Sequence, residues 1–215
     1  RAVASRTPPS PVEVEEALKV GRTFLSRSDT ARAVDVRLAM ADLHGVLPGS
    51  SPESRQQADA LISQAAEIAP RSPQPVLARL RWHAAAGQWD MVLATANAYR
   101  QARPDDSVVA NAAGLLMLES GDVKVQESSL TMLRSVLDLR PTEPQSYLNL
   151  GVALNKLNRT SEAKEVFQQG LQAVPNTPIL LMALGSLLCT TSEYDDAVAA
   201  YRQALELETQ SAPRR

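Results

Sequence analysis

The stretch that decides the fold runs from residue 147 to residue 205 and contains one pattern twice. The first copy, from Tyr147 to Pro175, reads YLNLGVALNKLNRTSEAKEVFQQGLQAVP, and the second, from Leu181 to Leu205, reads LMALGSLLCTTSEYDDAVAAYRQAL. Matching residues of the two copies are 34 positions apart. Apolar residues within each copy recur every three or four positions, which is the period of an α-helix. The sequence therefore predicts a tandem array of helix pairs.

Proline spacing extends the array toward the N-terminus. Pro70 and Pro104 are also 34 residues apart, whereas Pro104 and Pro141 are 37 apart. One repeat therefore carries about three additional residues, which the register of the flanking helices places between Gly121 and Ser129. We expect the insertion to lengthen a turn and to leave the packing faces of the helices unchanged.

The repeated residues are typical of a known family. Tyr147, Leu150, Gly151, Leu154, Ala163, Phe167 and Pro175 resemble the tetratricopeptide repeat signature of W-x2-L-G-x2-Y, A-x3-F and P. The resemblance implies an all-α fold, an α-α superhelix of antiparallel helix pairs with about five repeats and an additional N-terminal helix. In the least regular of the well-matched repeats, Leu80 stands where the glycine is expected.

The matches also predict how the chain is divided. We expect a piece of a longer protein, because the chain begins at Arg1 without an initiator methionine. The predicted segments are a disordered lead at 1–11, N-terminal helices with one degenerate repeat at 12–70, four repeats at 73–104, 107–141, 144–175 and 178–208, and a tail at 209–215.

Glycines at one point of three helices indicate close packing. A glycine inside a helix costs about 1 kcal/mol relative to alanine, yet Gly114, Gly151 and Gly185 occupy equivalent positions. A cost that recurs in register implies a close helix–helix approach. The predicted small partners are Ala163 and Ala197, with Phe167 and Tyr201 filling the space between successive repeats.

Turns between the two helices of a repeat need a left-handed residue, and Gly87, Gly121 and Asn158 are placed to supply it. Asn158 also begins an Asn-Arg-Thr glycosylation acceptor, but we favour the turn. Trp82 and Trp89 are expected to be buried between helices and not to form an exposed binding spot.

Composition excludes several function classes. The chain has 215 residues, 44% of them hydrophobic, and a formal net charge of -2, so no excess of basic residues predicts a nucleic-acid or anionic membrane partner. The apolar run from Ile179 to Cys189 is shorter than the roughly 20 residues that cross a bilayer. Cys189, the single cysteine, cannot form an internal disulfide, and a lone buried thiol acts as a small apolar side chain more often than as a nucleophile.

No motif predicts catalysis, a cofactor or a metal. His44 and His83 have no ligand-spaced partners, and no GxGxxG, P-loop or GxSxG motif occurs. The acidic group Glu193, Asp195 and Asp196 is explained by the positive end of a helix dipole. We therefore predict that the chain is not an enzyme.

The family resemblance implies a concave groove lined by the first helix of every repeat. A clamp for a C-terminal carboxylate is disfavoured, because Leu148, Val152, Met182 and Ala183 occupy positions where family members use Lys, Asn or Arg. Asparagine amides can instead bond an extended peptide backbone, for which Asn111, Asn149 and Asn155 are candidates. The full set of candidate groove residues is Arg81, Asn111, Gln145, Asn149, Asn155, Lys156 and Ser186.

These features predict a scaffold that binds a peptide or helix of a partner protein. Two alternatives remain: an assembly module of an export or envelope complex, including a homo-oligomer, and the recognition arm of a larger enzyme. An Ala-, Arg- and Leu-rich composition favours a soluble bacterial protein of the cytoplasm or periplasm.

Overall fold

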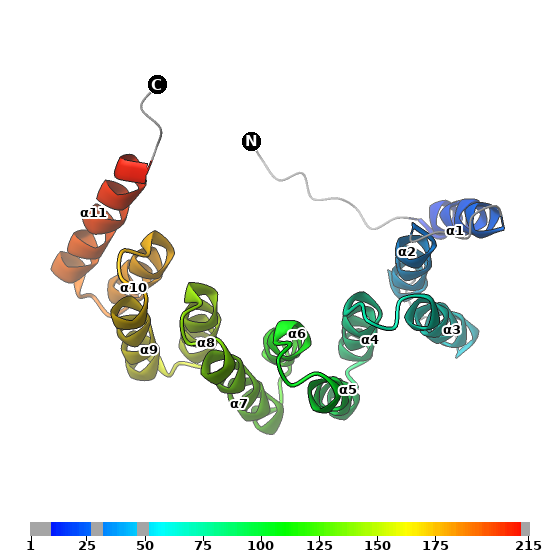
Figure 1. The fold of residues 1–215 in the computed structure, drawn as a ribbon, viewed down its shortest axis with the longest axis horizontal. Helices are drawn as coiled ribbons and strands as arrows, with labels where there is room; N and C mark the ends of the chain where they lie inside the picture. The colour runs from blue at the N-terminus through cyan, green and yellow to red at the C-terminus, as the bar shows by residue number, and fades with distance from the viewer. Residues whose placement is uncertain (1–9, 27–31, 47–51, 212–215) are drawn as a thin grey trace. The chain divides into compact units, whose positions relative to one another are not determined.

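The computed structural model describes residues 10–26, 32–46 and 52–211, which form eleven α-helices and no strand (Figure 1). Contacts between residues divide the chain into unit 1, residues 1–99, and unit 2, residues 100–215. The division falls inside α5. The helices are α1 Pro11–Leu25, α2 Arg32–Val46, α3 Pro52–Ile68, α4 Gln74–Ala85, α5 Trp89–Ala102, α6 Val108–Met117, α7 Val123–Leu139, α8 Pro144–Lys156, α9 Thr160–Ala173, α10 Pro178–Thr190 and α11 Tyr194–Ser211.

Both ends of the helical region extend beyond their predicted limits. Pro11 is already the first residue of α1, because Ser10 and Glu13 form a capping box that satisfies backbone N–H groups at the helix start. At the other end α11 continues to Ser211, since Thr209 does not terminate a helix as the prolines of earlier repeats do. The remaining repeat boundaries stay a prediction.

Apolar clusters join the described helices of unit 1. Val14 and Leu18 of α1 pack with Met40 of α2, whose sulfur occupies the space that a Cβ atom at Gly21 would need. A second cluster joins α2, α3 and α4 around Ile62, with Trp82 partly buried against it.

His44 at the end of α2 is buried, and its Nδ1 has no partner within the described residues. Burial lowers the pKa of His44, Arg22 adds to the lowering, and Glu15 opposes it. Burial therefore favours the neutral form of the His44 imidazole in the folded protein.

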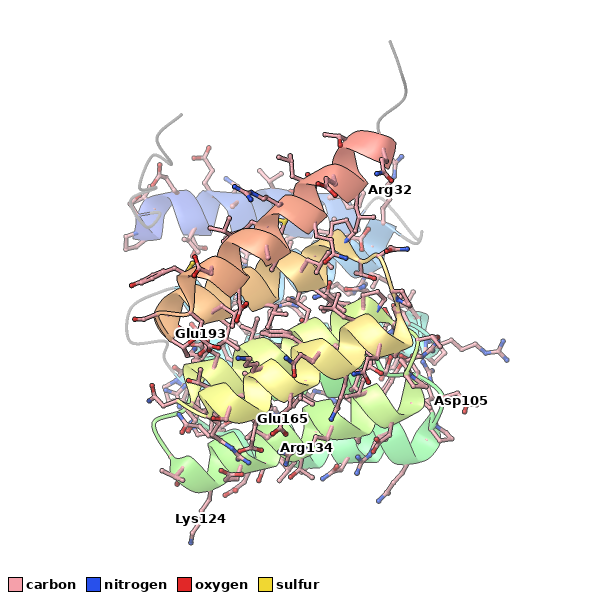
Figure 2. The ribbon with its side chains drawn as sticks, turned by 90° about the vertical axis from the view of Figure 1, so that its left-hand side faces the viewer. Arg32, Asp105, Lys124, Arg134, Glu165 and Glu193 are labelled. Carbon is pink, nitrogen blue, oxygen red and sulfur yellow. The ribbon has the colours of Figure 1, made fainter. Side chains whose placement is uncertain are left out.

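Unit 2 contains three helix pairs, α6 with α7, α8 with α9, and α10 with α11. Within this unit the first helices of the pairs lie in one row and the second helices in another (Figures 1 and 2). Leu133, Leu150, Phe167 and Leu180, all nearly inaccessible, belong to one continuous core cluster. Neighbouring pairs therefore share a core, as expected for a stacked array.

The repeated glycines lie where the second helix of the pair approaches closely. A Cβ atom at Gly151 would lie 2.3 Å from Cε1 of Phe167, and one at Gly185 would lie 2.9 Å from Cε1 of Tyr201. Each glycine thus makes room for the aromatic ring of its own repeat. Phe167 also belongs to one core cluster with Leu180 and Leu187 of the following pair, as predicted for a ring between successive repeats, whereas Tyr201 is 39% exposed.

The inserted residues lengthen a helix and not a turn. Asp122 caps the N-terminus of α7, where its Oδ1 accepts a hydrogen bond from the Lys124 N–H at 2.7 Å. The helix therefore starts at Val123 and has 17 residues, whereas α9 has 14. One additional turn of helix absorbs three residues, and this preserves the register of the packing face beyond it.

The turn predictions are confirmed at two sites and wrong at the third. Gly87 and Asn158 have φ angles of 68° and 60°, in the left-handed region. Ser192 takes the same role before α11, with a φ of 63°. Gly121 does not have a positive φ, because the side chain of Ser120 accepts a bond from the Asp122 N–H and the capped α7 begins at once.

Candidate functional site

The face of unit 2 formed by α6, α8 and α10, which we call the first-helix face, exposes large apolar side chains. Val108, Leu115, Val152, Ile179 and Met182 are each between 36% and 49% exposed. Val108, Gln145 and Ile179 occupy equivalent positions of the three helices, as do Leu115, Val152 and Ser186. Apolar side chains therefore recur along the row in the register of the repeat.

Three of the predicted groove residues form a ladder of amides on this face. Gln145 Nε2 donates to Asn149 Oδ1 at 2.8 Å, and Asn149 Nδ2 donates to Asn111 Oδ1 at 2.7 Å. Both polar atoms of the Asn149 side chain are thus used within the protein. The Oε1 atom of Gln145 and the Nδ2 atom of Asn111 stand at the two ends of the ladder, one an acceptor and the other a donor.

The other candidates are more dispersed. Lys156 Nζ lies 2.6 Å from Glu119 Oε1, so this cation is paired with the segment that follows α6. Asn155 is half-buried on α8, and Ser186 is exposed on α10. Arg81 lies on α4 in unit 1, where its Nη2 is 3.3 Å from Asp42 Oδ2. The structure thus brings together Asn111, Gln145 and Asn149, and it gives Arg81 a local ion-pair partner.

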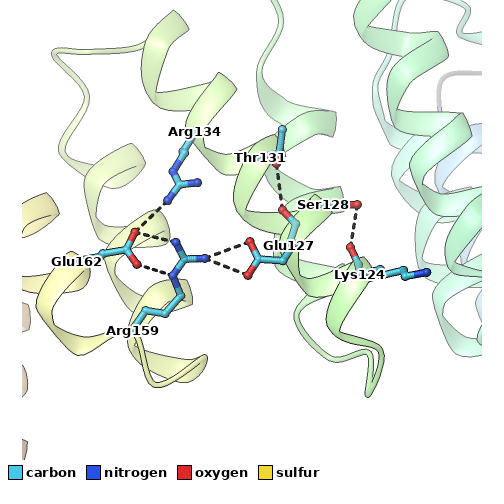
Figure 3. A network of polar contacts seen from close by, with 7 residues as sticks. All are labelled: Lys124, Glu127, Ser128, Thr131, Arg134, Arg159 and Glu162. Atoms are coloured by element: carbon cyan, nitrogen blue, oxygen red, sulfur yellow. Dashed lines mark hydrogen bonds and ion pairs between the residues drawn. The ribbon is translucent and has the colours of Figure 1, made fainter.

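The second helices of unit 2 display a different chemistry. Arg159 bridges two repeats: its Nε lies 2.6 Å from Glu162 Oε1, and its Nη1 lies 3.0 Å from Glu127 Oε1 on α7 (Figure 3). Arg134 Nη2 of α7 is 3.2 Å from Glu162 Oε2. The hydrogen bond from Arg159 lowers the pKa of Glu162, aided by the charges of Arg159 and Arg134.

The same pairing continues toward α11. Lys164 Nζ of α9 lies 2.6 Å from Glu193 Oε2. Hydrogen bonds from Lys164 first, and from Thr191 second, lower the pKa of Glu193. Figure 2 shows α7, α9 and α11 stacked, with Lys124, Arg134, Glu165 and Glu193 among their charged side chains. Asp195 and Asp196 lie in the first turn of α11, as the helix-dipole interpretation predicts.

Sequence reasoning missed part of the first-helix face. Val108, Ile179 and Glu119 were not among the candidates, although Val108 and Ile179 stand in register with Gln145. Repeat register was the signal that could have found them. Cys189 is exposed on α10. The buried side of α10 is taken by the two residues before it, Leu187 and Leu188.

Within residues 10–26, 32–46 and 52–211, no three His, Cys, Asp or Glu side chains gather closely enough to bind a metal ion. Over the same ranges, none of the helices combines the length and the apolar character that a membrane span requires.

Comparison with known proteins identifies the repeat type. Residues 148–214 match the tetratricopeptide repeat family model. Protein FlbA of Caulobacter vibrioides is 35% identical over 68 residues, which are 32% of this chain and 11% of FlbA. The chain therefore spans only about a tenth of the length of that curated relative.

Solved structures support the same architecture over most of the chain. MamA of Desulfovibrio magneticus is 16% identical with a TM-score of 0.54, covering 91% of this chain and 97% of that one. A thermophilic TPR protein of Thermus thermophilus is 18% identical with a TM-score of 0.52, covering 92% and 93%. At these identities the likeness shows the fold alone. The predicted all-α superhelix of antiparallel helix pairs is confirmed.

Proposed function

We propose that this chain, which carries tetratricopeptide repeats, is a protein–protein interaction scaffold that binds a peptide or helix of a partner on its first-helix face. One observation carries the proposal: the first-helix face combines apolar side chains that recur in the register of the repeat with a ladder of hydrogen-bonded amides. On the second helices, by contrast, Arg134, Arg159 and Glu162 are already paired with charged groups of the protein.

The pairing on the second helices reduces their capacity to recruit a partner. Arg159 already contacts two carboxylates, and Lys164 is paired with Glu193. A partner that used these charges would have to break existing pairs before it gained new ones. Exposed ion pairs contribute only about 0–1 kcal/mol each to stability, but a partner gains less from a charged group that is already paired.

The first-helix face instead favours a partner with few charges. Burial of Val152 and Met182 would supply the apolar contribution, at about 25 cal/mol per Å² of apolar surface removed from water. The Lys156–Glu119 pair closes one side of the face without adding net charge.

The amide ladder gives a way to hold a peptide backbone. Gln145 Oε1 can accept from a backbone N–H, and Asn111 Nδ2 can donate to a backbone C=O. Because Asn149 holds both neighbours, the ends are already oriented, and less side-chain entropy is lost on binding than with free amides. Backbone recognition of this kind selects an extended conformation more than a particular sequence.

A display selection with random peptides tests the proposal. Peptides enriched on the native chain should be rich in apolar residues and poor in charge, and a double substitution Val152→Glu and Met182→Glu should weaken their binding at least tenfold. Val123→Glu is the matched control, because Val123 is 69% exposed on α7 and lies outside the first-helix face. Enrichment of strongly charged peptides, or equal loss of binding in the control, would contradict the assignment.

A second variant separates the amides from the apolar contacts. Asn149→Ala removes both hydrogen bonds of the ladder, and we expect several-fold weaker binding of the selected peptides without loss of helicity. Adding Asn155→Ala tests whether the half-buried amide six residues further along α8 contributes. Binding equal to that of the native chain in both variants would remove the amides from the site.

A further inference from the structure

Unit 1 contains a pocket that is separate from the first-helix face of unit 2. The pocket has a volume of about 670 Å³ and is lined by residues of α3, α4 and the start of α5. This volume falls within the roughly 300–1,000 Å³ that is typical of ligand pockets. The lining includes two arginines, one carboxylate and two large apolar side chains, which are Arg55, Arg79, Asp59, Trp82 and Met91. We call this site the α3–α5 pocket.

The charges that line this pocket do not balance. Arg79 Nη2 on α4 lies 3.8 Å from Asp59 Oδ1 on α3, and Asp59 is the only carboxylate among the described residues that line the pocket. Arg55 stands one turn before Asp59 on the same face of α3. It is exposed and forms no ion pair within the described part of the chain. The pocket therefore has one positive charge in excess.

Arg79 is held in place, but the protein does not use all of its donors. Its Nη2 donates to Ser63 Oγ at 3.0 Å, and this bond ties α4 to α3. Its Nε is buried and has no hydrogen-bond partner among the described residues. A guanidinium carries five N–H donors, and the side chain of Arg79 is 32% exposed. Arg79 can therefore bond a further acceptor and keep its bond to Ser63.

Apolar side chains line the same pocket. Trp82 is partly buried against the core cluster around Ile62, so core packing holds its ring. Met91 on α5 is 49% exposed. A ligand in this pocket can therefore contact a cation and an apolar surface together.

The size of the charge excess indicates which anion fits. Arginine pairs best with planar carboxylates and with phosphates. A carboxylate carries one negative charge and matches the excess, whereas a phosphate monoester carries about 1.5–2 negative charges at neutral pH. The carboxylate is therefore the better match.

We propose that the α3–α5 pocket binds an acidic side chain, glutamate or aspartate, that has apolar neighbours in a peptide of a partner protein. The carboxylate bonds Arg79 and approaches Arg55, and the apolar neighbours contact Trp82 and Met91. Because the pocket lies in unit 1, this binding does not depend on the proposed function of the first-helix face.

Titration of the 215-residue chain with short blocked peptides tests the proposal. The probe is acetyl-Leu-Glu-Leu-amide, and acetyl-Leu-Gln-Leu-amide is the uncharged control of the same shape. The NMR signal of the Trp82 indole N–H, assigned with the variant Trp89→Phe, should shift with the glutamate peptide at a Kd of about 1 mM or tighter. The glutamine peptide should bind at least about fivefold more weakly, because it cannot form a charge-assisted bond.

Substitutions with opposite expected signs separate binding from stability. Arg79→Met should weaken binding of the glutamate peptide about tenfold, and Arg55→Gln about threefold because Arg55 is more exposed. Asp59→Asn removes a competing carboxylate and should strengthen binding several-fold, a gain that damage to the fold would not produce. Lys19→Gln is the matched control, because Lys19 is an exposed cation of α1 outside the pocket. Circular dichroism checks that each variant keeps its helicity.

A further peptide tests the source of the carboxylate. Acetyl-Leu-Gln-Leu with a free C-terminus carries its only charge on the main chain. Binding of this peptide without binding of the glutamate peptide would overturn the assignment to a side chain.

Three other results would also overturn the proposal. These are equal affinity for the glutamate and glutamine peptides, unchanged affinity in both arginine variants, and weaker binding in the Asp59→Asn variant. The double variant Val152→Glu with Met182→Glu changes only the first-helix face and should bind the glutamate peptide normally. Failure of this proposal can therefore be distinguished from failure of the proposed function.

Discussion

The contact between Gly151 and Phe167 makes a quantitative prediction, because two opposite effects meet at one position. Replacing glycine by alanine inside a helix ordinarily stabilises it by about 1 kcal/mol. At Gly151, however, the new methyl carbon would lie 2.3 Å from Cε1, 2.6 Å from Cζ and 2.8 Å from Cδ1 of Phe167. The ring is 2% exposed and surrounded by the core cluster, so it cannot swing into solvent.

Relief of this clash requires movement of a packed ring or of the helices. Overpacking of this kind costs about 1–3 kcal/mol, which exceeds the gain in helix propensity. We therefore expect Gly151→Ala to lower the free energy of unfolding by about 1.5 kcal/mol. For a chain of this size the melting temperature should fall by roughly 3–6 °C, and Gly151→Leu should lower it further.

Thermal and urea unfolding followed by circular dichroism measure the effect. Gly121→Ala is the control, because a Cβ atom there meets nothing within 4 Å and its φ is not positive. We expect its melting temperature to stay close to that of the native chain. A Gly151→Ala variant more stable than the native chain would refute the packing argument, since helix propensity alone would then decide the outcome.

A compensating pair extends the test. Leu80 and Ala96 of unit 1 occupy the positions that correspond to Gly151 and Phe167, and both are fully buried. The large and small residues have thus exchanged helices in that repeat. Phe167→Ala alone should lower the free energy of unfolding by about 3–5 kcal/mol. The double variant Gly151→Leu with Phe167→Ala should lose at least about 1 kcal/mol less of this free energy than the two single variants lose together. Strict additivity would count against a shared space.

Three other measurements test buried and surface polar groups. Ser129 Oγ donates to the buried Gly114 carbonyl at 2.6 Å, so Ser129→Ala should lower the free energy of unfolding by about 1 kcal/mol in urea titrations; no change would show that the bond adds nothing to stability. The pKa of His44 lies below its unfolded value of 6.5, so the stability that His44 contributes is present above pH 6.5 and is lost as the pH falls through the folded pKa. Between about pH 7.5 and 5 the melting temperature of the His44→Gln variant should therefore fall less than that of the native chain. The pKa of Glu162 lies below 4.5, so the stabilising contribution of this carboxylate is complete above that pH and disappears on acidification. The difference in melting temperature between the native chain and the Arg159→Met variant should shrink from about pH 6 to pH 3. A difference that stays constant over this range would exclude a charge effect.

The fold can be predicted from the sequence because the length and apolar spacing of the repeats indicate the helix pairs. A 34-residue period with helical spacing fixes helix pairs and their order, and two turn residues, Gly87 and Asn158, take the left-handed conformation expected of them. Chemical patterning also separates first from second helices, which is how Asn111, Gln145 and Asn149 could be placed on one face. The helix pairs, the turn residues and the shared helix face all depend on the spacing of residues along the chain, which can be read directly from the sequence.

Other features depend on contacts between helices. The sequence contains Gly151 and Phe167, but only the packed structure shows that they share one space within a single repeat. The three inserted residues are helical and extend the N-terminus of α7, because Asp122 accepts a hydrogen bond from the Lys124 N–H and so caps the helix there. Only a few hydrogen bonds distinguish this longer helix from a longer loop. The joining of separate amides into a ladder likewise requires adjacent helices at a set distance.

The sequence by itself thus determined the helix pairs, their period and the helix face that carries Asn111, Gln145 and Asn149. Only the tertiary structure decided which side chains are paired, which glycine accepts which ring, and which residues of α3, α4 and α5 line one pocket. The physical reason is that helical period is a property of neighbouring residues, whereas pairing and exposure depend on the distances between helices, which non-local packing sets.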